Sequence, residues 1–139
     1  MGLVYADVEL INGDDLAYVR KSIIDKDEVK RMHFNMLVDT GSLMLTINEN
    51  IQEIMQFPVV EKKRFQLANR EIGEYDLVSS VELRFKNRRT LCEAIVLPRD
   101  SEPLLGAIPM EAMDVVILVA RQELVVNPEH PDRAILKLK

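Results

Sequence analysis

Cysteine is almost absent from this chain, and other features that mark particular classes of protein are missing as well. The single Cys92 cannot form an internal disulfide, and because no signal-like segment opens the chain we expect a protein of the reducing cytoplasm. The apolar run at residues 115–120 is far shorter than the about 20 residues of a membrane span. The net charge of -5 argues against a nucleic-acid partner, since phosphate contacts need a basic surface. We therefore predict that the protein binds neither membrane nor nucleic acid.

The motifs of metal, phosphate and serine chemistry are also missing. His33 and His130 are far apart in sequence and have no second ligand at metal-binding spacing. No glycine-rich phosphate loop is present, and Ser42 does not lie in a Gly-x-Ser-x-Gly motif. We accordingly predict no metal and no cofactor, with His33 on the face of a strand and Cys92 in the core.

The dominant pattern is instead a period of two, which is typical of β-strands with one apolar face. Residues 4–10 alternate in this way, and residues 29–38 form another such run that ends at Asp39. The Asn-Gly-Asp-Asp sequence at 12–15 is a strong turn signal, so residues 16–24 are predicted as a second strand. The three strands would form an antiparallel meander that leads into Asp39.

The rest of the chain continues the strand pattern, with two short helices. Asn48 is a good helix cap, and Phe57-Pro58 ends the first helix. The second helix is predicted to run from Pro109 to Met113. The further predicted strands are a long hairpin over 64–81 with its tip at 68–71, followed by 81–85, 90–97, 115–118 and 122–126. The length allows one domain, which we place at residues 1–127, followed by a polar tail at 128–139.

Two short motifs carry the chemistry. The apolar strand Met36-Leu37-Val38 runs directly into Asp39-Thr40-Gly41-Ser42, and Leu104-Leu105-Gly106 comes much later, just before a helix. This pair resembles the aspartic protease clan, in which such segments cross to form one lobe. The chain resembles bacterial and cyanobacterial single-domain retropepsin-like proteases, and this resemblance includes residues 67–69, 104–109 and 122–131. The resemblance implies an all-β fold, a closed retropepsin-like barrel with one or two short helices and one lobe per chain.

The resemblance also implies a function. Only one Asp-Thr-Gly is present, so the chain is expected to work as a homodimeric aspartic endopeptidase, with one catalytic Asp39 from each subunit acting on an extended peptide. The subunits would meet through the active-site loop and the terminal strands. The residues expected to support the active-site loop are Thr40, Gly41, Ser42, Leu104, Leu105 and Gly106. The residues expected in a substrate-covering flap are Ala68, Asn69 and Arg70.

Individual roles follow from the same resemblance. Thr40 would reach the partner loop across the two-fold axis, Gly41 would donate its N–H to the Asp39 carboxylate, and the Ser42 hydroxyl could donate to it as well. Two other hypotheses remain open: a catalytically silent binding or dimerisation module that keeps the fold, and a subunit that pairs with a different chain.

Overall fold

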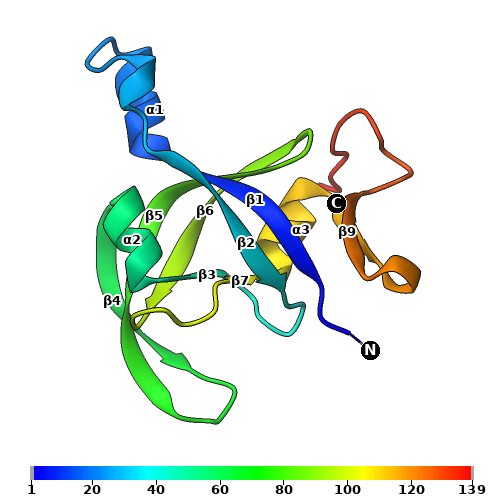
Figure 1. Ribbon diagram of the computed structural model, residues 1–139. Coiled ribbons are helices and arrows are strands. Elements are labelled where there is room, and N and C mark those ends of the chain that lie inside the picture. Colours follow the sequence, from blue (N-terminus) through cyan, green and yellow to red (C-terminus); the bar gives the residue numbers. More distant parts are fainter. Residues whose placement is uncertain (1, 139) are drawn as a thin grey trace.

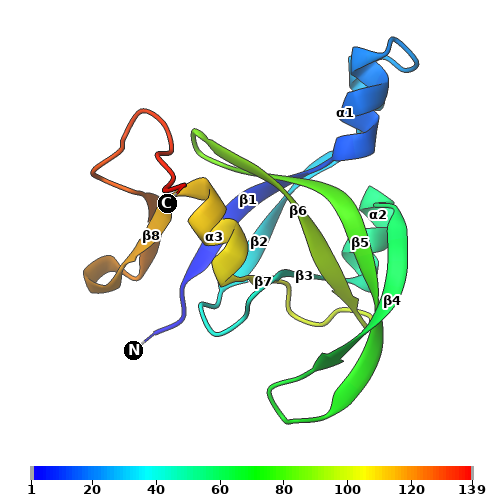
Figure 2. The ribbon, with the colours of Figure 1, turned by 180° about the vertical axis from the view of Figure 1, so that it is seen from behind.

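The computed structural model describes residues 2–138 of the chain (Figures 1 and 2). Its elements are, in chain order, β1 (Tyr5–Asn12), α1 (Gly13–Arg20), the 3-10 helix η1 (Lys26–Glu28), β2 (Arg31–Val38), β3 (Leu45–Asn48), α2 (Glu49–Met55), β4 (Val59–Gln66), β5 (Ile72–Phe85), β6 (Arg88–Leu97), β7 (Leu104–Leu105), α3 (Ala107–Met113), β8 (Val115–Leu118), the 3-10 helix η2 (Val119–Arg121) and β9 (Glu123–Val126). None of the helices in this part of the chain has the length and apolar character that a membrane crossing requires.

Six strands close into a ring. Their hydrogen-bonded order is β1-β2-β7-β3-β6-β5, and β5 pairs back with β1. β1 runs antiparallel to β2 through residues 5–11, and its other edge pairs with β5 through residues 9–12. β4 continues from β5 outside the ring. The predicted all-β barrel with one lobe per chain is therefore confirmed.

The alternating apolar side chains of the strands fill this ring. Val8 and Leu10 on β1 are completely buried, as are Leu45 and Ile47 on β3 and Leu83 on β5. Each such side chain contributes about 1.5–3 kcal/mol relative to an exposed one. Because a shift of one residue would turn every one of these side chains outward, the alternation holds the strands in register.

The long strand β5 belongs to two parts of the fold. Residues 72–78 pair with β4, and residues 81–84 pair with β1. Between these segments the register with β6 shifts, and Ser80 adopts a φ of 58°, which is the geometry of a β-bulge that bends a strand. As a result residues 59–78, here called the flap hairpin, project from the barrel (Figures 1 and 2). The tip lies at the predicted position.

The predicted second strand of the meander is wrong, because residues 13–20 form helix α1. The Asn12 side chain accepts a hydrogen bond from the N–H of Asp15 at 3.1 Å, which caps the helix, and Asp14 and Asp15 carry negative charge in its first turn. Asn12 also donates to the carbonyl of Met55 at 2.9 Å, so its side chain ties α1 to α2. β1 and β2 consequently pair directly, while α1 stands out from the barrel (Figure 1).

The remaining elements are close to those predicted. Asn48 caps α2 by accepting from the N–H of Ile51 at 2.8 Å. The second predicted helix, α3, begins at Ala107 rather than at Pro109, and β8 pairs with β9 as a hairpin. Residues 127–138 contain neither helix nor strand, and Asp114 at the end of α3 anchors them by accepting from the Asn127 side chain at 3.0 Å.

Candidate active site

Asp39 follows directly after β2, where that strand passes beside β7. The two strands are parallel, with Leu37 opposite Leu104 and Val38 opposite Leu105. The N–H of Asp39 donates to the carbonyl of Leu105 at 3.0 Å, which extends the pairing by one residue. The two motifs separated in the sequence therefore lie side by side, and β7 fixes the position of Asp39.

The loop after Asp39 folds back onto its carboxylate. The N–H of Gly41 donates to Oδ1 of Asp39 at 2.9 Å, the contact that the resemblance implies, and the N–H of Ser42 donates to the Asp39 carbonyl at 3.1 Å. The prediction that the Ser42 hydroxyl donates to Asp39 is wrong, because it donates to the carbonyl of Met44 at 3.3 Å. Asp39 is half-buried, whereas Thr40 and Gly41 are exposed.

Gly106 lies beneath this loop in close backbone contact with it. A Cβ placed on Gly106 would lie 2.3 Å from the carbonyl oxygen of Met44 and 2.7 Å from that of Ser42. Helix α3 starts immediately after it, and the N–H groups of Ala107 and Ile108 donate to the carbonyls of Ser42 and Leu43 at 2.8 and 2.9 Å. The first N–H groups of α3 thus hold the loop, and a glycine is required where the backbones meet.

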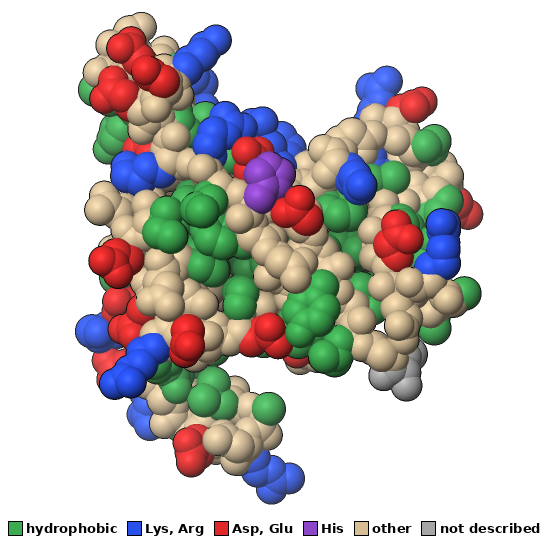
Figure 3. Space-filling model, in the orientation of Figure 1, with side chains coloured by type: hydrophobic (Ala, Val, Ile, Leu, Met, Phe, Trp, Pro, Cys, Tyr) green, Lys and Arg blue, Asp and Glu red, His purple; other side chains and the backbone are tan. Residues whose placement is uncertain are grey.

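A cavity of about 460 Å³ lies between the active-site loop and the flap hairpin. Asp39 forms part of its wall, residues 65–68 of the flap hairpin form another part, and Ile95 and Leu104 line it from the sheet. In Figure 3 the flap hairpin stands out from the body at the lower edge. Among the residues described, Asp39 is the only ionisable side chain that lines this cavity.

The predicted flap residues lie at the tip of the flap hairpin, but they are not equivalent. Ala68 lines the cavity, whereas Asn69 and Arg70 do not. The N–H of Arg70 donates to the carbonyl of Leu67 at 2.9 Å, and Arg70 has a φ of 69°. This is the three-residue hairpin loop in which glycine usually occupies the left-handed position.

A second cavity, of about 490 Å³, lies on the other side of Asp39 and Thr40. The N-terminal residues 2–4 line it together with Ile117 and Val119 from the β8–β9 hairpin. Leu3 and Val119 expose 67% and 64% of their surface, so an apolar area adjoins the exposed Thr40. The N-terminal residues and the β8–β9 hairpin therefore meet beside the candidate active site.

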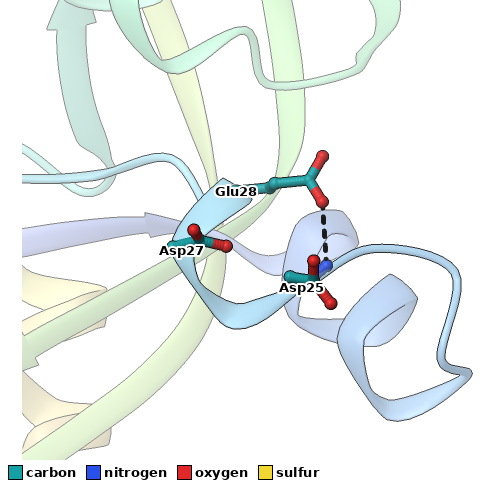
Figure 4. Close-up of side chains that lie close together, drawn as sticks. All are labelled: Asp25, Asp27 and Glu28. Atoms are coloured by element: carbon teal, nitrogen blue, oxygen red, sulfur yellow. Dashed lines mark hydrogen bonds between the residues drawn. The ribbon is translucent and has the colours of Figure 1, made fainter.

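Other clusters of polar side chains lie away from Asp39. A cavity of about 520 Å³ beside β1 and β9 has Asp7 and His33 in its wall, with Nδ1 of His33 3.3 Å from Oδ1 of Asp7. Asp25, Asp27 and Glu28 lie close together around η1 (Figure 4). All three are exposed, and the Glu28 carboxylate accepts from the Asp25 N–H at 3.0 Å, so a capping interaction explains their arrangement.

The lining residues on the strands were not predicted from the sequence. Phe65 and Leu67 on the flap, Thr46 on β3 and Leu97 on β6 all face the cavity that contains Asp39. The alternation along a strand predicts which side chains share a face, and it places Phe65 and Leu67 on the same face. Which of the two faces turns toward Asp39 depends on the closure of the barrel.

Comparison with known proteins agrees with this geometry. A family described as aspartyl protease matches residues 24–108, which is more than half of the chain and extends from before β2 into the start of α3. The match includes both the Asp39 loop and Leu104-Leu105-Gly106. No curated protein matches the chain. Because the family match spans the crossing of the two motifs and the flap hairpin, the chain belongs to the aspartyl protease family.

Proposed function

We propose that the protein is an aspartic endopeptidase whose active site forms when two copies of the chain bring their Asp39 carboxylates together. The observation that carries the proposal is that Asp39 is the only ionisable group along the cavity within residues 2–138. Hydrolysis of a peptide bond by acid–base chemistry needs one group that accepts a proton and one that donates it. One chain offers a single such group, so a second copy supplies the other.

The chemistry follows from the closeness of the two carboxylates. Two carboxylates a few ångströms apart share one proton, because both cannot carry a negative charge at low cost. The ionised Asp39 removes a proton from water, and the water oxygen attacks the peptide carbonyl carbon. The protonated Asp39 of the second copy gives its proton to the carbonyl oxygen. When the resulting tetrahedral intermediate collapses, the C–N bond breaks and the first Asp39 gives the proton it took from water to the leaving nitrogen. The second Asp39 takes back a proton from a hydroxyl group of the intermediate as the new carboxyl group forms.

The residues around Asp39 have supporting roles in this proposal. Gly41 stabilises the ionised carboxylate through its N–H group. The exposed Thr40 is available to hydrogen-bond to the loop of the second copy. Leu105 and Gly106 set the position of Asp39, through the backbone hydrogen bond at 3.0 Å and through close packing beneath the loop. Leu104 forms part of the cavity wall.

The surface for dimerisation surrounds Thr40. The N-terminal residues 2–4 and the β8–β9 hairpin present exposed apolar side chains there, including Leu3 and Val119. Burying them against the same surface of a second copy would form a self-complementary two-fold interface. The substrate would lie as an extended strand in the cavity, beneath the flap tip with Ala68, Asn69 and Arg70.

The decisive experiment is cleavage of a peptide library by the wild type and by Asp39→Asn at acidic and neutral pH. We expect cleavage by the wild type and none by the variant, with Asp27→Asn as a matched control because Asp27 is exposed and lies outside the cavity. Equal activity of the wild type and Asp39→Asn would refute the catalytic role. Absence of cleavage by the wild type would favour a silent binding module.

A mixing experiment tests the assembly. When wild type is mixed with an equal amount of Asp39→Asn and subunits exchange freely, mixed dimers form and the activity falls to about half. Unchanged activity would show that one chain, or a different partner, supplies the complete site. Sedimentation provides an independent measurement, since a protein that stays monomeric at all concentrations contradicts the homodimer.

A further inference from the structure

Thr46 is the one polar residue on β3 whose side chain faces the cavity that contains Asp39. Its neighbours Leu45 and Ile47 point into the barrel core and are completely buried. Because side chains alternate along a strand, Thr46 points to the other face, where it lines the cavity. Thr46 itself is only 3% exposed, so the cavity is the one space that its side chain can reach.

The hydroxyl of Thr46 has no hydrogen-bond partner among residues 2–138. The fully enclosed side-chain polar atoms without a partner in this part of the chain are Nε and Nη1 of Arg88. Because the Thr46 hydroxyl has no partner and is not among these atoms, it is not fully enclosed, and it opens onto the cavity that Thr46 lines. The hydroxyl of Ser42 in the same wall differs, because it is bonded to the Met44 carbonyl.

The surroundings of this hydroxyl are apolar. Thr46 pairs with Ile95 on one side and with Leu104 on the other, and both of these residues line the cavity. A charged substrate group placed here would lose its hydration without an opposite charge nearby. A neutral hydroxyl or amide group would instead gain a hydrogen bond and keep its carbon atoms against apolar walls.

From this placement we infer that Thr46 determines substrate specificity. The cavity takes a substrate side chain that carries a neutral hydrogen-bonding group, and the Thr46 hydroxyl selects it over an apolar side chain of the same shape. This inference rests on the proposed function, since it assigns the cavity beside Asp39 to a substrate side chain. A site with a hydrogen-bonding group rejects the apolar analogue because its own polar group is then left without a partner.

The test compares Thr46→Val, which keeps the shape and removes the hydroxyl, with Thr46→Ser, which keeps the hydroxyl. Peptides are synthesised in pairs that differ at one position, with Thr against Val, Tyr against Phe, and Asn against Leu. We expect one position at which the wild type prefers the polar member by about tenfold in kcat/KM. Thr46→Ser should keep this preference and Thr46→Val should abolish it. A preference that Thr46→Val leaves unchanged at every position would overturn the inference.

Two further measurements keep the inference separate from the catalytic proposal. The affinity of the same peptides, carrying a fluorescent label, is measured for Asp39→Asn with and without Thr46→Val. This experiment tests the preference of the cavity in the absence of cleavage. Loss of the preference there supports the role of Thr46 even if the wild type does not cleave, and an absence of peptide binding overturns it. Because the hydroxyl has no partner within the protein, Thr46→Val should melt at the same or a higher temperature than the wild type. A clear decrease would instead indicate a structural hydrogen bond.

Discussion

Among the Gly→Ala substitutions possible in this chain, Gly106→Ala is expected to destabilise the active-site loop most. The new Cβ would lie 2.3 Å from the Met44 carbonyl oxygen, 2.7 Å from that of Ser42 and 2.8 Å from the Leu43 carbonyl carbon. All three atoms belong to the backbone, so no rotation of a side chain can relieve the contact. Either the loop after Asp39 or the start of α3 must move.

The size of the effect can be estimated from three contributions. Forcing an extra methyl group into a packed site costs about 1–3 kcal/mol. Moving the loop also weakens the hydrogen bonds from Ala107 and Ile108, which contribute about 1 kcal/mol each. Alanine also lowers the conformational entropy of the unfolded chain, which stabilises the folded state by about 0.4–1 kcal/mol. This gain applies here because the φ of −89° at Gly106 suits any residue. The net loss is about 2–4 kcal/mol of the free energy of unfolding, out of the roughly 5–15 kcal/mol typical of a domain.

Urea denaturation followed by circular dichroism provides the measurement. With a slope of about 2 kcal/mol per molar urea, the midpoint should fall by about 1–2 M. Gly73→Ala is the matched control, because its Cβ would meet only the ring of Tyr75, which can rotate away. The cleavage activity of Gly106→Ala should also be lost under conditions where the variant is still folded, since small displacements of a catalytic group cost large factors in rate. A stability within about 1 kcal/mol of the wild type, or a loss no larger than that of Gly73→Ala, would refute this reasoning.

Three other predictions concern particular side chains. Arg70→Gly should raise the free energy of unfolding by about 1 kcal/mol, because Arg70 holds a left-handed conformation at the flap tip; no gain in urea midpoint would contradict this. Hydrogen bonds from Asn127 and Ile135 lower the pKa of Asp114 from 3.8 to about 2. The lower pKa in the folded state means that this carboxylate stabilises the protein above about pH 4, and that the contribution is lost as the pH falls toward 2. Asp114→Asn should therefore show a flatter acid limb in urea midpoint against pH, and an unchanged limb would refute the role of Asp114. Burial raises the pKa of Cys92 to about 12, so its thiol should react with iodoacetamide at pH 8 far more slowly in the native than in the unfolded protein; similar rates would show that the site is open.

The comparison between sequence and structure is informative at individual residues. The alternation of Val8 and Leu10 predicted a strand and its buried face correctly, because that pattern depends on local geometry alone. Asn12 was a different case, since Asn-Gly-Asp-Asp is compatible both with a hairpin turn and with a helix cap. The structure resolves this in favour of the cap, because the Asn12 side chain bonds to Asp15 and Met55 at the same time. The contact to Met55 depends on a residue far away in the sequence.

The candidate site likewise has parts that the sequence reveals and contacts that only the folded structure reveals. Asp39-Thr40-Gly41 and Leu104-Leu105-Gly106 could be recognised from the sequence because the pair of short motifs resembles that of aspartic proteases. Their pairing through the Asp39 N–H and the Leu105 carbonyl, and the contact of Gly106 with the loop above it, exist only in the folded barrel.

The sequence by itself determined the class of fold, the residue at the centre of the candidate site and the family to which the chain belongs. Only the tertiary structure decided which acceptor the Ser42 hydroxyl uses, which face of β3 lies toward Asp39, and that Thr46 ends in a cavity with an unbonded hydroxyl. The physical reason is that a strand pattern specifies which side chains share a face. What that face meets is set by the closure of the ring and by the bulge that directs the flap hairpin over the site.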